Sequence, residues 1–184
     1  HEPATETSAP YGIPDCRMSI KKHYLLPGDI LVSVVPMEIT TVLGSCVSVC
    51  LYDPITKIGG INHYLLPGNE SEAHADASKG NTSIPLLVKM MLNRGAIREN
   101  LKAKIFGGAS PVAAEQSLYA IGRRNIAVAI DILKQEGIYL AARDTGGSQG
   151  RKIIFHTATG KVTMQLLPHP ITSFQYENNK GFDH

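Results

Sequence analysis

Cys46 and His63 are the two residues of this sequence whose types and spacing best suit covalent chemistry. Cys46 follows a turn that contains Gly44 and Ser45, and it precedes an apolar run at residues 47–51. A glycine at such a turn permits unusual backbone angles, so that the following amides can converge beside the thiol. A thiol becomes nucleophilic near neutral pH when a base such as imidazole takes its proton. The pattern suggests a cysteine nucleophile activated by a histidine, with backbone amides near Gly44 and Ser45 holding an oxyanion.

The elements that must position this pair are two neighbouring strands. Residues 47–52 alternate in the period of two that is typical of a strand, and an Asp-Pro pair then turns the chain. Residues 58–66 are expected to form the hairpin partner, which can bring Cys46 and His63 to the same end of the sheet. The alternative is that a cysteine in an apolar strand is a small buried hydrophobic residue, a role that suits Cys50 better than Cys46.

Other chemistry of the cysteines is disfavoured by spacing. Cys46 and Cys50 share one face of the predicted strand but lie roughly 13 Å apart at ~3.3 Å per residue, which is too far for a disulfide. A structural zinc site needs four ligands at spacings such as CxxC, and the scattered histidines do not supply them. The glycines at residues 107–108 and 146–150 match neither the dinucleotide nor the P-loop pattern. We therefore expect no metal site.

The remaining elements indicate an α+β fold. Further strands are expected at residues 30–35, 102–106, 138–143, 153–156 and 162–167, the last two as a hairpin. Helices are expected at residues 83–95, capped by Ser83, and from residue 124 or 125 to 136, each ended by a glycine. Because hairpins outnumber βαβ units, the pattern favours mixed or antiparallel sheet with two or three helices on one side.

Length and composition limit the remaining possibilities. The chain has 184 residues, 43% of them hydrophobic, and a net charge of +2. This suits one globular domain at residues 17–170, with a mobile N-terminal tail at 1–16 and a polar C-terminal tail at 171–184. The short apolar runs predict no membrane insertion, and the scattered Lys and Arg residues predict no nucleic-acid partner. Three cysteines without a disulfide framework, and no signal peptide, favour the cytoplasm.

Five strings, in order along the chain, resemble one known family, the chemoreceptor glutamine deamidases called CheD. They are LGSCV at residues 43–47, HYLLP at 63–67, KIFGGA at 104–109, IGRRN at 121–125, and DTGG at 144–147 with Arg151. The strings span nearly the whole predicted domain. On sequence alone, DTGG could be a tight turn or a functional loop, and turn chemistry alone explains it.

This resemblance implies both a fold and an activity. The fold would be an α/β/β sandwich, and the activity would be hydrolysis of particular glutamine side chains on methyl-accepting chemotaxis receptors, giving glutamate. The catalytic cysteine and histidine of the family fall on Cys46 and His63, and its threonine falls on Thr40, with Thr41 one residue away. The resemblance implies that no cofactor is required.

Two other functions remain open on the sequence. The resemblance implies a CheC-type phosphatase as a partner, so the chain could act as a regulator that binds this partner with little or no catalysis. A thiol hydrolase or transglutaminase-like enzyme acting on another substrate would use the same Cys46 and His63 pair. Binding alone requires neither residue, which favours the deamidase.

Overall fold

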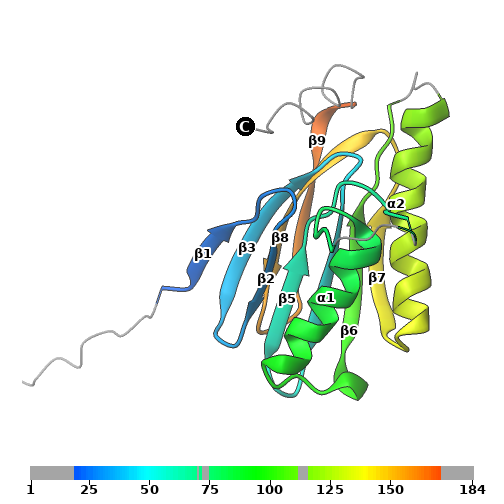
Figure 1. Ribbon diagram of the computed structural model, residues 1–184. Coiled ribbons are helices and arrows are strands. Elements are labelled where there is room, and N and C mark those ends of the chain that lie inside the picture. The colour runs from blue at the N-terminus through cyan, green and yellow to red at the C-terminus, as the bar shows by residue number, and fades with distance from the viewer. Residues whose placement is uncertain (1–18, 70, 72–74, 112–115, 171–184) are drawn as a thin grey trace, which may run out of the picture.

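Two β-sheets stack face to face, and two helices cover the outer face of the larger sheet (Figure 1). The layers therefore follow in the order α, β, β, which confirms the predicted sandwich. The molecule is known from a computed structural model, which describes residues 19–69, 71, 75–111 and 116–170. The predicted tails at residues 1–16 and 171–184 lie outside these described residues.

The larger sheet positions the predicted cysteine and histidine. Its strands lie in the order β2 (Ile30–Ser33), β5 (Ile58–Asn62), β4 (Val47–Asp53), β6 (Lys102–Gly107) and β7 (Tyr139–Thr145). Strands β4 and β5 form the predicted antiparallel hairpin, with Cys50 opposite Ile61. Strands β6 and β7 are parallel, because helix α2 (Gln116–Gln135) carries the chain back between them.

The smaller sheet contains two strands for which the sequence carried no expectation. Its order is β1 (Lys21–Tyr24), β3 (Met37–Leu43), β8 (Gln149–His156) and β9 (Val162–Pro170). Strands β8 and β9 are the predicted hairpin, slightly longer than expected. Strand β3 is one of the two unexpected strands. Its residues alternate, with Ile39, Thr41 and Leu43 buried between the sheets and Thr40 on the opposite face.

Helix α1 (Gly80–Asn93) begins earlier than predicted, so Ser83 is not its cap. The first two amides of the helix donate instead to the carbonyls of Leu66 and Pro67, at 2.8 and 3.0 Å. These main-chain acceptors satisfy the orphan donors of the helix, and no side-chain cap is required. Ser83 is buried inside the helix, where its hydroxyl accepts a hydrogen bond of 3.0 Å from the Asn62 side chain.

Helix α2 extends further toward the N-terminus than the predicted residues 124–136. Gly122 interrupts the apolar pattern there, but it allows a close approach of two backbones. A Cβ atom at Gly122 would lie 2.7 Å from the carbonyl oxygen of Gly108. Gly95 and Gly137 follow the two helices with φ angles of +104° and +68°, as predicted for helix ends. No helix in the described part of the chain is long and apolar enough to cross a membrane.

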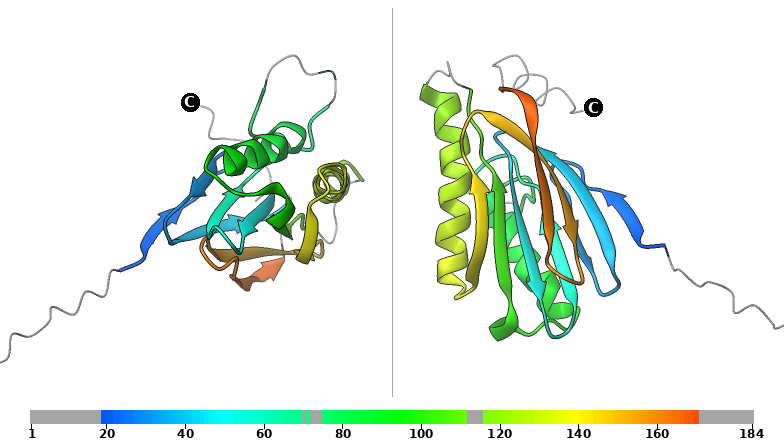
Figure 2. Two further views of the ribbon diagram at one scale, coloured as in Figure 1. Left: turned by 90° about the horizontal axis from the view of Figure 1, so that it is seen from below. Right: turned by 180° about the vertical axis from the view of Figure 1, so that it is seen from behind.

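Two apolar layers hold the sandwich together. The views from below and behind show the backbone layers that enclose them, with the helices on one side of the larger sheet and the smaller sheet on the other (Figure 2). We call the first the helix–sheet layer; its most buried members include Val47, Val49, Leu51, Ile84, Leu87, Met91, Ile105, Ala129 and Leu133. We call the second the inter-sheet layer; it contains Leu25, Met37, Ile39, Leu43, Cys46, Cys50, Ile61, Phe106, Ile153 and Phe155. Because side chains alternate along a strand, β4 contributes to both layers.

Candidate active site

The hairpin register places Cys46 and His63 on the same face of the larger sheet. Val47 and Tyr64 form an antiparallel pair that exchanges backbone hydrogen bonds of 3.1 and 3.0 Å. Cys46 directly precedes Val47 in the sequence, and His63 directly precedes Tyr64. In an antiparallel ladder these two positions are diagonal neighbours whose side chains point the same way. Both side chains enter the inter-sheet layer at its edge, so the structure brings together the two residues that the sequence singled out.

A threonine from the opposite sheet orients His63. The Thr41 hydroxyl lies 2.8 Å from His63 Nδ1 and 2.9 Å from the carbonyl oxygen of Leu25. A hydroxyl has one proton, and the Leu25 carbonyl can only accept, so Thr41 donates to Leu25 and accepts from Nδ1–H. His63 is therefore held in the tautomer that leaves Nε2 with a free lone pair. Among the described residues, this buried Nε2 atom has no hydrogen-bond partner.

This contact comes from the second of two adjacent threonines. The resemblance implies Thr40 as the third member of the site, with Thr41 as the alternative if the match slips by one residue, and the hydrogen bond to His63 comes from Thr41. The physical reason is the alternation along β3: Ile39 and Leu43 are buried between the sheets, so Thr41 shares their face and Thr40 does not.

Burial keeps the pair neutral. Cys46 is 9% exposed and His63 is 2% exposed. Burial raises the pKa of the Cys46 thiol to about 12, although a hydrogen bond from the residue's own backbone amide lowers it in part. Burial also lowers the pKa of His63 to about 4. At neutral pH the site therefore holds a thiol and a neutral imidazole rather than an ion pair, and the imidazole is ready to accept a proton.

The turn before Cys46 has its carbonyls held and its amides free. The carbonyls of Gly44 and Cys46 accept hydrogen bonds of 2.9 Å each from the amides of Ala109 and Gly108. The Ser45 carbonyl accepts one of 3.0 Å from a side chain of helix α2. Within the described residues, no amide of the three turn residues donates to another residue. Free amides beside a nucleophile are what an oxyanion requires.

The unusual backbone of the turn lies on a neighbouring segment rather than at Gly44. Among the described glycines with positive φ are Gly107, at +105°, and Gly108, at +71°, and Gly44 is not one of them. A Cβ atom at Gly107 would lie 2.2 Å from the Cys46 carbonyl oxygen, so only glycine permits this approach. The sequence string KIFGGA thus supports the catalytic turn from outside.

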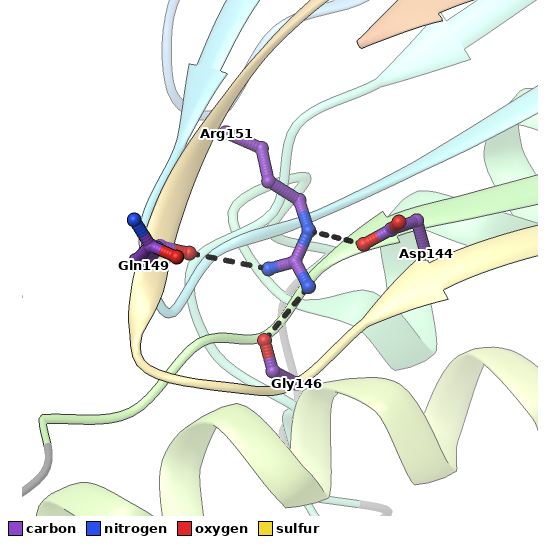
Figure 3. Close-up of polar contacts among 4 residues, drawn as sticks. All are labelled: Asp144, Gly146, Gln149 and Arg151. Carbon is purple, nitrogen blue, oxygen red and sulfur yellow. Dashed lines mark hydrogen bonds and ion pairs between the residues drawn. The ribbon is translucent and has the colours of Figure 1, made fainter. Parts of the chain in front are cut away.

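A buried arginine, Arg151, holds the loop that contacts the Gly107–Gly108 segment (Figure 3). Arg151 donates from Nε to Asp144 at 2.7 Å, and its other nitrogens donate to the carbonyls of Gly146 and Gln149 at 2.8 and 3.3 Å. The loop held in this way contacts the glycine segment, because the Gly146 amide donates to the Gly107 carbonyl at 2.9 Å. The DTGG string therefore contains the end of β7 and the start of the connection to β8, and this connection supports the site.

Asn125 joins the strands that carry the two reactive residues. Its side-chain amide donates to the carbonyls of Ser45 and Leu65, at 3.0 and 2.9 Å. The main-chain carbonyl of Asn125 accepts a hydrogen bond from the hydroxyl of Tyr64. Asn125 is fully buried. The sequence indicated this residue only as the end of the IGRRN string, because a helical asparagine reveals no chemistry until its partners are known.

Comparison with known proteins identifies the family of this chain. Residues 65–166 match the family described as CheD chemotactic sensory transduction. A "Probable chemoreceptor glutamine deamidase CheD 1" of Anaeromyxobacter dehalogenans (strain 2CP-C) is 42% identical over 144 residues, which cover 78% of this chain and 84% of the relative. The chain belongs to the CheD family.

Two further relatives from distant bacteria carry similar names. A "Probable chemoreceptor glutamine deamidase CheD" of Trichlorobacter lovleyi is 43% identical over 79% of this chain and 90% of its own length. One of Sulfurimonas denitrificans is 41% identical over 82% of this chain and 97% of its own length. The similarity of this CheD chain to these relatives therefore extends over most of the sandwich.

The second thiol of this CheD chain has a different environment. Cys50 lies on the same face of β4 as Cys46, but it is fully buried in the inter-sheet layer. Burial raises its pKa further above the ordinary range than that of Cys46, although Lys104 lowers it in part. Both cysteines are free thiols. No group of three or more His, Cys, Asp or Glu side chains in the described part of the chain could hold a metal ion.

Proposed function

We propose that this CheD chain is a protein-glutamine deamidase of chemoreceptors, with Cys46 as nucleophile and His63 as general base and acid. The observation that carries the proposal is the strand register that places Cys46 diagonal to His63, together with the contact by which Thr41 holds Nδ1 of His63 and leaves Nε2 without a partner among the described residues. The names of the relatives supply the substrate class. Thr41 takes the orienting role that a third group has in other catalytic triads.

The burial of the pair favours a side-chain amide over a main-chain amide. Cys46 is 9% exposed and His63 is 2% exposed, so little of either side chain is accessible from outside. A peptide bond within a protein chain is flanked by residues on both sides, which hinders its approach to so buried a thiol. A glutamine side chain presents its amide at the end of an unbranched stem, which suits deamidation rather than proteolysis.

The first half of the reaction makes a thioester. As Cys46 Sγ attacks the amide carbon, its proton passes to His63 Nε2, and the carbonyl π electrons move to the oxygen. The free amides of the turn, Ser45 and Cys46, donate to this oxyanion. When the oxyanion collapses, the bond between carbon and nitrogen breaks. The nitrogen takes the proton from Nε2 and leaves as ammonia.

The second half regenerates the enzyme. Water gives a proton to His63 Nε2 as its oxygen attacks the thioester carbon, and the same amides hold the second oxyanion. The bond between carbon and sulfur then breaks, and the Cys46 sulfur takes the proton back from Nε2. The products are a glutamate side chain and the free thiol. Since a free thiol is required throughout, the proposal includes a reducing, cytoplasmic location.

The test uses the full chain and a cytoplasmic fragment of a chemoreceptor. Mass spectrometry of the fragment should reveal the mass increase that accompanies conversion of particular glutamines to glutamates, with release of ammonia. Cys46→Ala and His63→Ala should abolish both signals. Cys50→Ala is the matched control, because it removes a buried thiol from the same face of the same strand, and it should retain activity.

Two results would contradict the proposal. One is deamidation that survives Cys46→Ala, which would place the nucleophile elsewhere. The other is no deamidation of several folded receptors by a folded chain, which would favour a regulator that binds a CheC-type phosphatase without catalysis.

A further inference from the structure

The peptide unit between Ser45 and Cys46 is oriented by one side chain. A trans peptide unit is planar, and its carbonyl and its amide point in opposite directions. The Ser45 carbonyl points at Asn125 Nδ2, 3.0 Å away on helix α2. The Cys46 amide of the same unit must therefore point away from the helix. That is the direction in which an oxyanion donor is required.

The orientation of the Asn125 side chain is unambiguous. Its two amide protons go to the carbonyls of Ser45 and Leu65, and among the described residues its oxygen Oδ1 has no partner. A rotation that exchanged Oδ1 and Nδ2 would place an acceptor against two carbonyl oxygens, which would repel it. Asn125 therefore serves here as a double donor, and this role requires the carboxamide.

Asn125 is also the side chain through which this orientation can be changed. The other two carbonyls of the turn, those of Gly44 and Cys46, accept from the main-chain amides of Ala109 and Gly108. A substitution does not remove a main-chain amide unless it introduces proline. The Ser45 carbonyl, in contrast, depends on a side chain that mutation can replace.

We propose that Asn125 is a positioning residue that directs the Cys46 amide toward the oxyanion formed in acyl transfer to Cys46. The inference rests on the cysteine chemistry of the proposed function, but it does not depend on which protein supplies the glutamine. Tyr64 assists, because its hydroxyl donates to the main-chain carbonyl of Asn125 and so fixes the position of the Asn125 backbone.

Two small reagents distinguish an effect on the orientation of the Cys46 amide from an effect on the activation of the Cys46 thiol. Iodoacetamide alkylates Cys46 by substitution: the sulfur–carbon bond forms, iodide leaves, and no oxyanion appears. With p-nitrophenyl acetate, sulfur adds to the ester carbonyl, an oxyanion forms, and p-nitrophenolate leaves as the thioester is made. Both reactions require the thiol proton to be removed, and only the second requires the oxyanion donors.

The experiment measures both rates at Cys46 in a Cys16→Ser background, with labelling confirmed by mass spectrometry. We expect Asn125→Ala to lower the rate of acylation about 100-fold and to leave the rate of alkylation unchanged. Tyr64→Phe, which keeps the aromatic ring, should lower the same ratio of rates by a smaller factor. This second variant keeps the test decisive if Asn125→Ala does not fold.

Thr157→Ala is the matched control. Thr157 is a buried residue that also joins main-chain segments, since it accepts from the Met37 amide at 2.9 Å and donates to the Val35 carbonyl at 3.3 Å. It lies at the opposite end of the sandwich, because β8 pairs with the catalytic end of β3 at Arg151 and with the other end at His156. Its loss should lower stability without changing the ratio of the two rates.

The outcomes distinguish this inference from the proposed function. If acylation and alkylation fall together in both variants, or if neither falls, Asn125 does not orient the oxyanion donor and the inference is wrong. If the ratio falls as expected while the wild-type chain deamidates no receptor, the inference stands and the proposed substrate is wrong. Receptor deamidation at the wild-type rate by Asn125→Ala would overturn the inference alone.

Discussion

The two apolar layers of this protein differ in what they bury. The hydrophobic residues buried in the helix–sheet layer are almost all aliphatic, with Tyr64 and Met91 as the exceptions. The polar side chains buried on this side, Asn62, Ser83 and Asn125, form hydrogen bonds that join the helices to the sheet. The inter-sheet layer contains two thiols, and at its catalytic edge the buried polar residues Thr41 and His63 touch. One layer stabilises the larger sheet, and the edge of the other carries the chemistry.

Strand β4 shows why the two roles can coexist. Its residues Val47, Val49 and Leu51 face the helices, and Cys46 and Cys50 face the second sheet. The helices therefore hold the strand from one side while a reactive group projects from the other. This division predicts that changes to the aliphatic residues of the helix–sheet layer affect stability, and changes at the edge of the inter-sheet layer affect rate. Tyr64 is the exception, because its hydroxyl binds Asn125, which in turn binds the turn before Cys46.

The largest effect on stability should come from the helix–sheet layer. Leu87 on α1 is fully buried there. Leu87→Ala should lower the free energy of unfolding by about 3–5 kcal/mol, because it leaves a cavity between helix and sheet. Urea titration measures this loss, and the turnover number should not change at a temperature at which the variant remains folded. A turnover number that falls with stability would mean that the layers are not independent.

A smaller effect should appear with pH at the catalytic edge. Burial lowers the pKa of His63 from 6.5 to about 4, so the unfolded chain binds a proton more readily than the folded chain. The stability contributed by this residue is fully present above pH 6.5 and is lost as the pH falls toward about 4, by about 3 kcal/mol in total.

Urea titrations at several pH values test this dependence. The acid loss of stability should be smaller by that amount in His63→Gln, which cannot titrate, and should persist in Leu87→Ala. If the wild type and His63→Gln lose equal stability in acid, water reaches His63 in the folded protein and its pKa is not lowered by burial.

The two neighbouring threonines give a prediction about rate. Thr41→Val removes the hydroxyl that orients His63 and should lower the turnover number about tenfold, as expected for loss of one hydrogen bond of about 1.4 kcal/mol. Thr40→Val, on the opposite face of β3, should leave the turnover number unchanged. Steady-state ammonia release measures both. The reverse result would assign the orienting role to Thr40, as the sequence alone predicted.

The smallest effect should come from the second thiol. Cys50→Ala removes one buried sulfur from the middle of the inter-sheet layer and should lower the free energy of unfolding by about 1 kcal/mol. The turnover number should stay at the wild-type value, since Cys50 does not belong to the catalytic edge. A marked fall in turnover would show that the chemistry extends further into this layer than its edge.

The sequence by itself determined the class of fold and predicted Cys46 and His63 as the reactive pair. A thiol beside a glycine-containing turn, and a histidine at a hairpin distance, were visible in residue types and spacing at Cys46 and His63. An α+β fold with mixed or antiparallel sheet could be predicted because local periodicity and turn residues indicate which segments are strands and helices. These signals are local, so they can be read from the sequence without knowing any contact between distant segments. The α/β/β order of the layers was implied by the resemblance to the family.

Only the tertiary structure decided how the pair is oriented and charged. Strand β3 and the choice of Thr41 depend on the packing of one sheet against the other, and residue spacing does not contain that information. The hydrogen bonds of Asn125 join a helix to two strands far away in the sequence. The neutral state of Cys46 and His63 follows from burial, which is a property of the packed molecule and not of the chain.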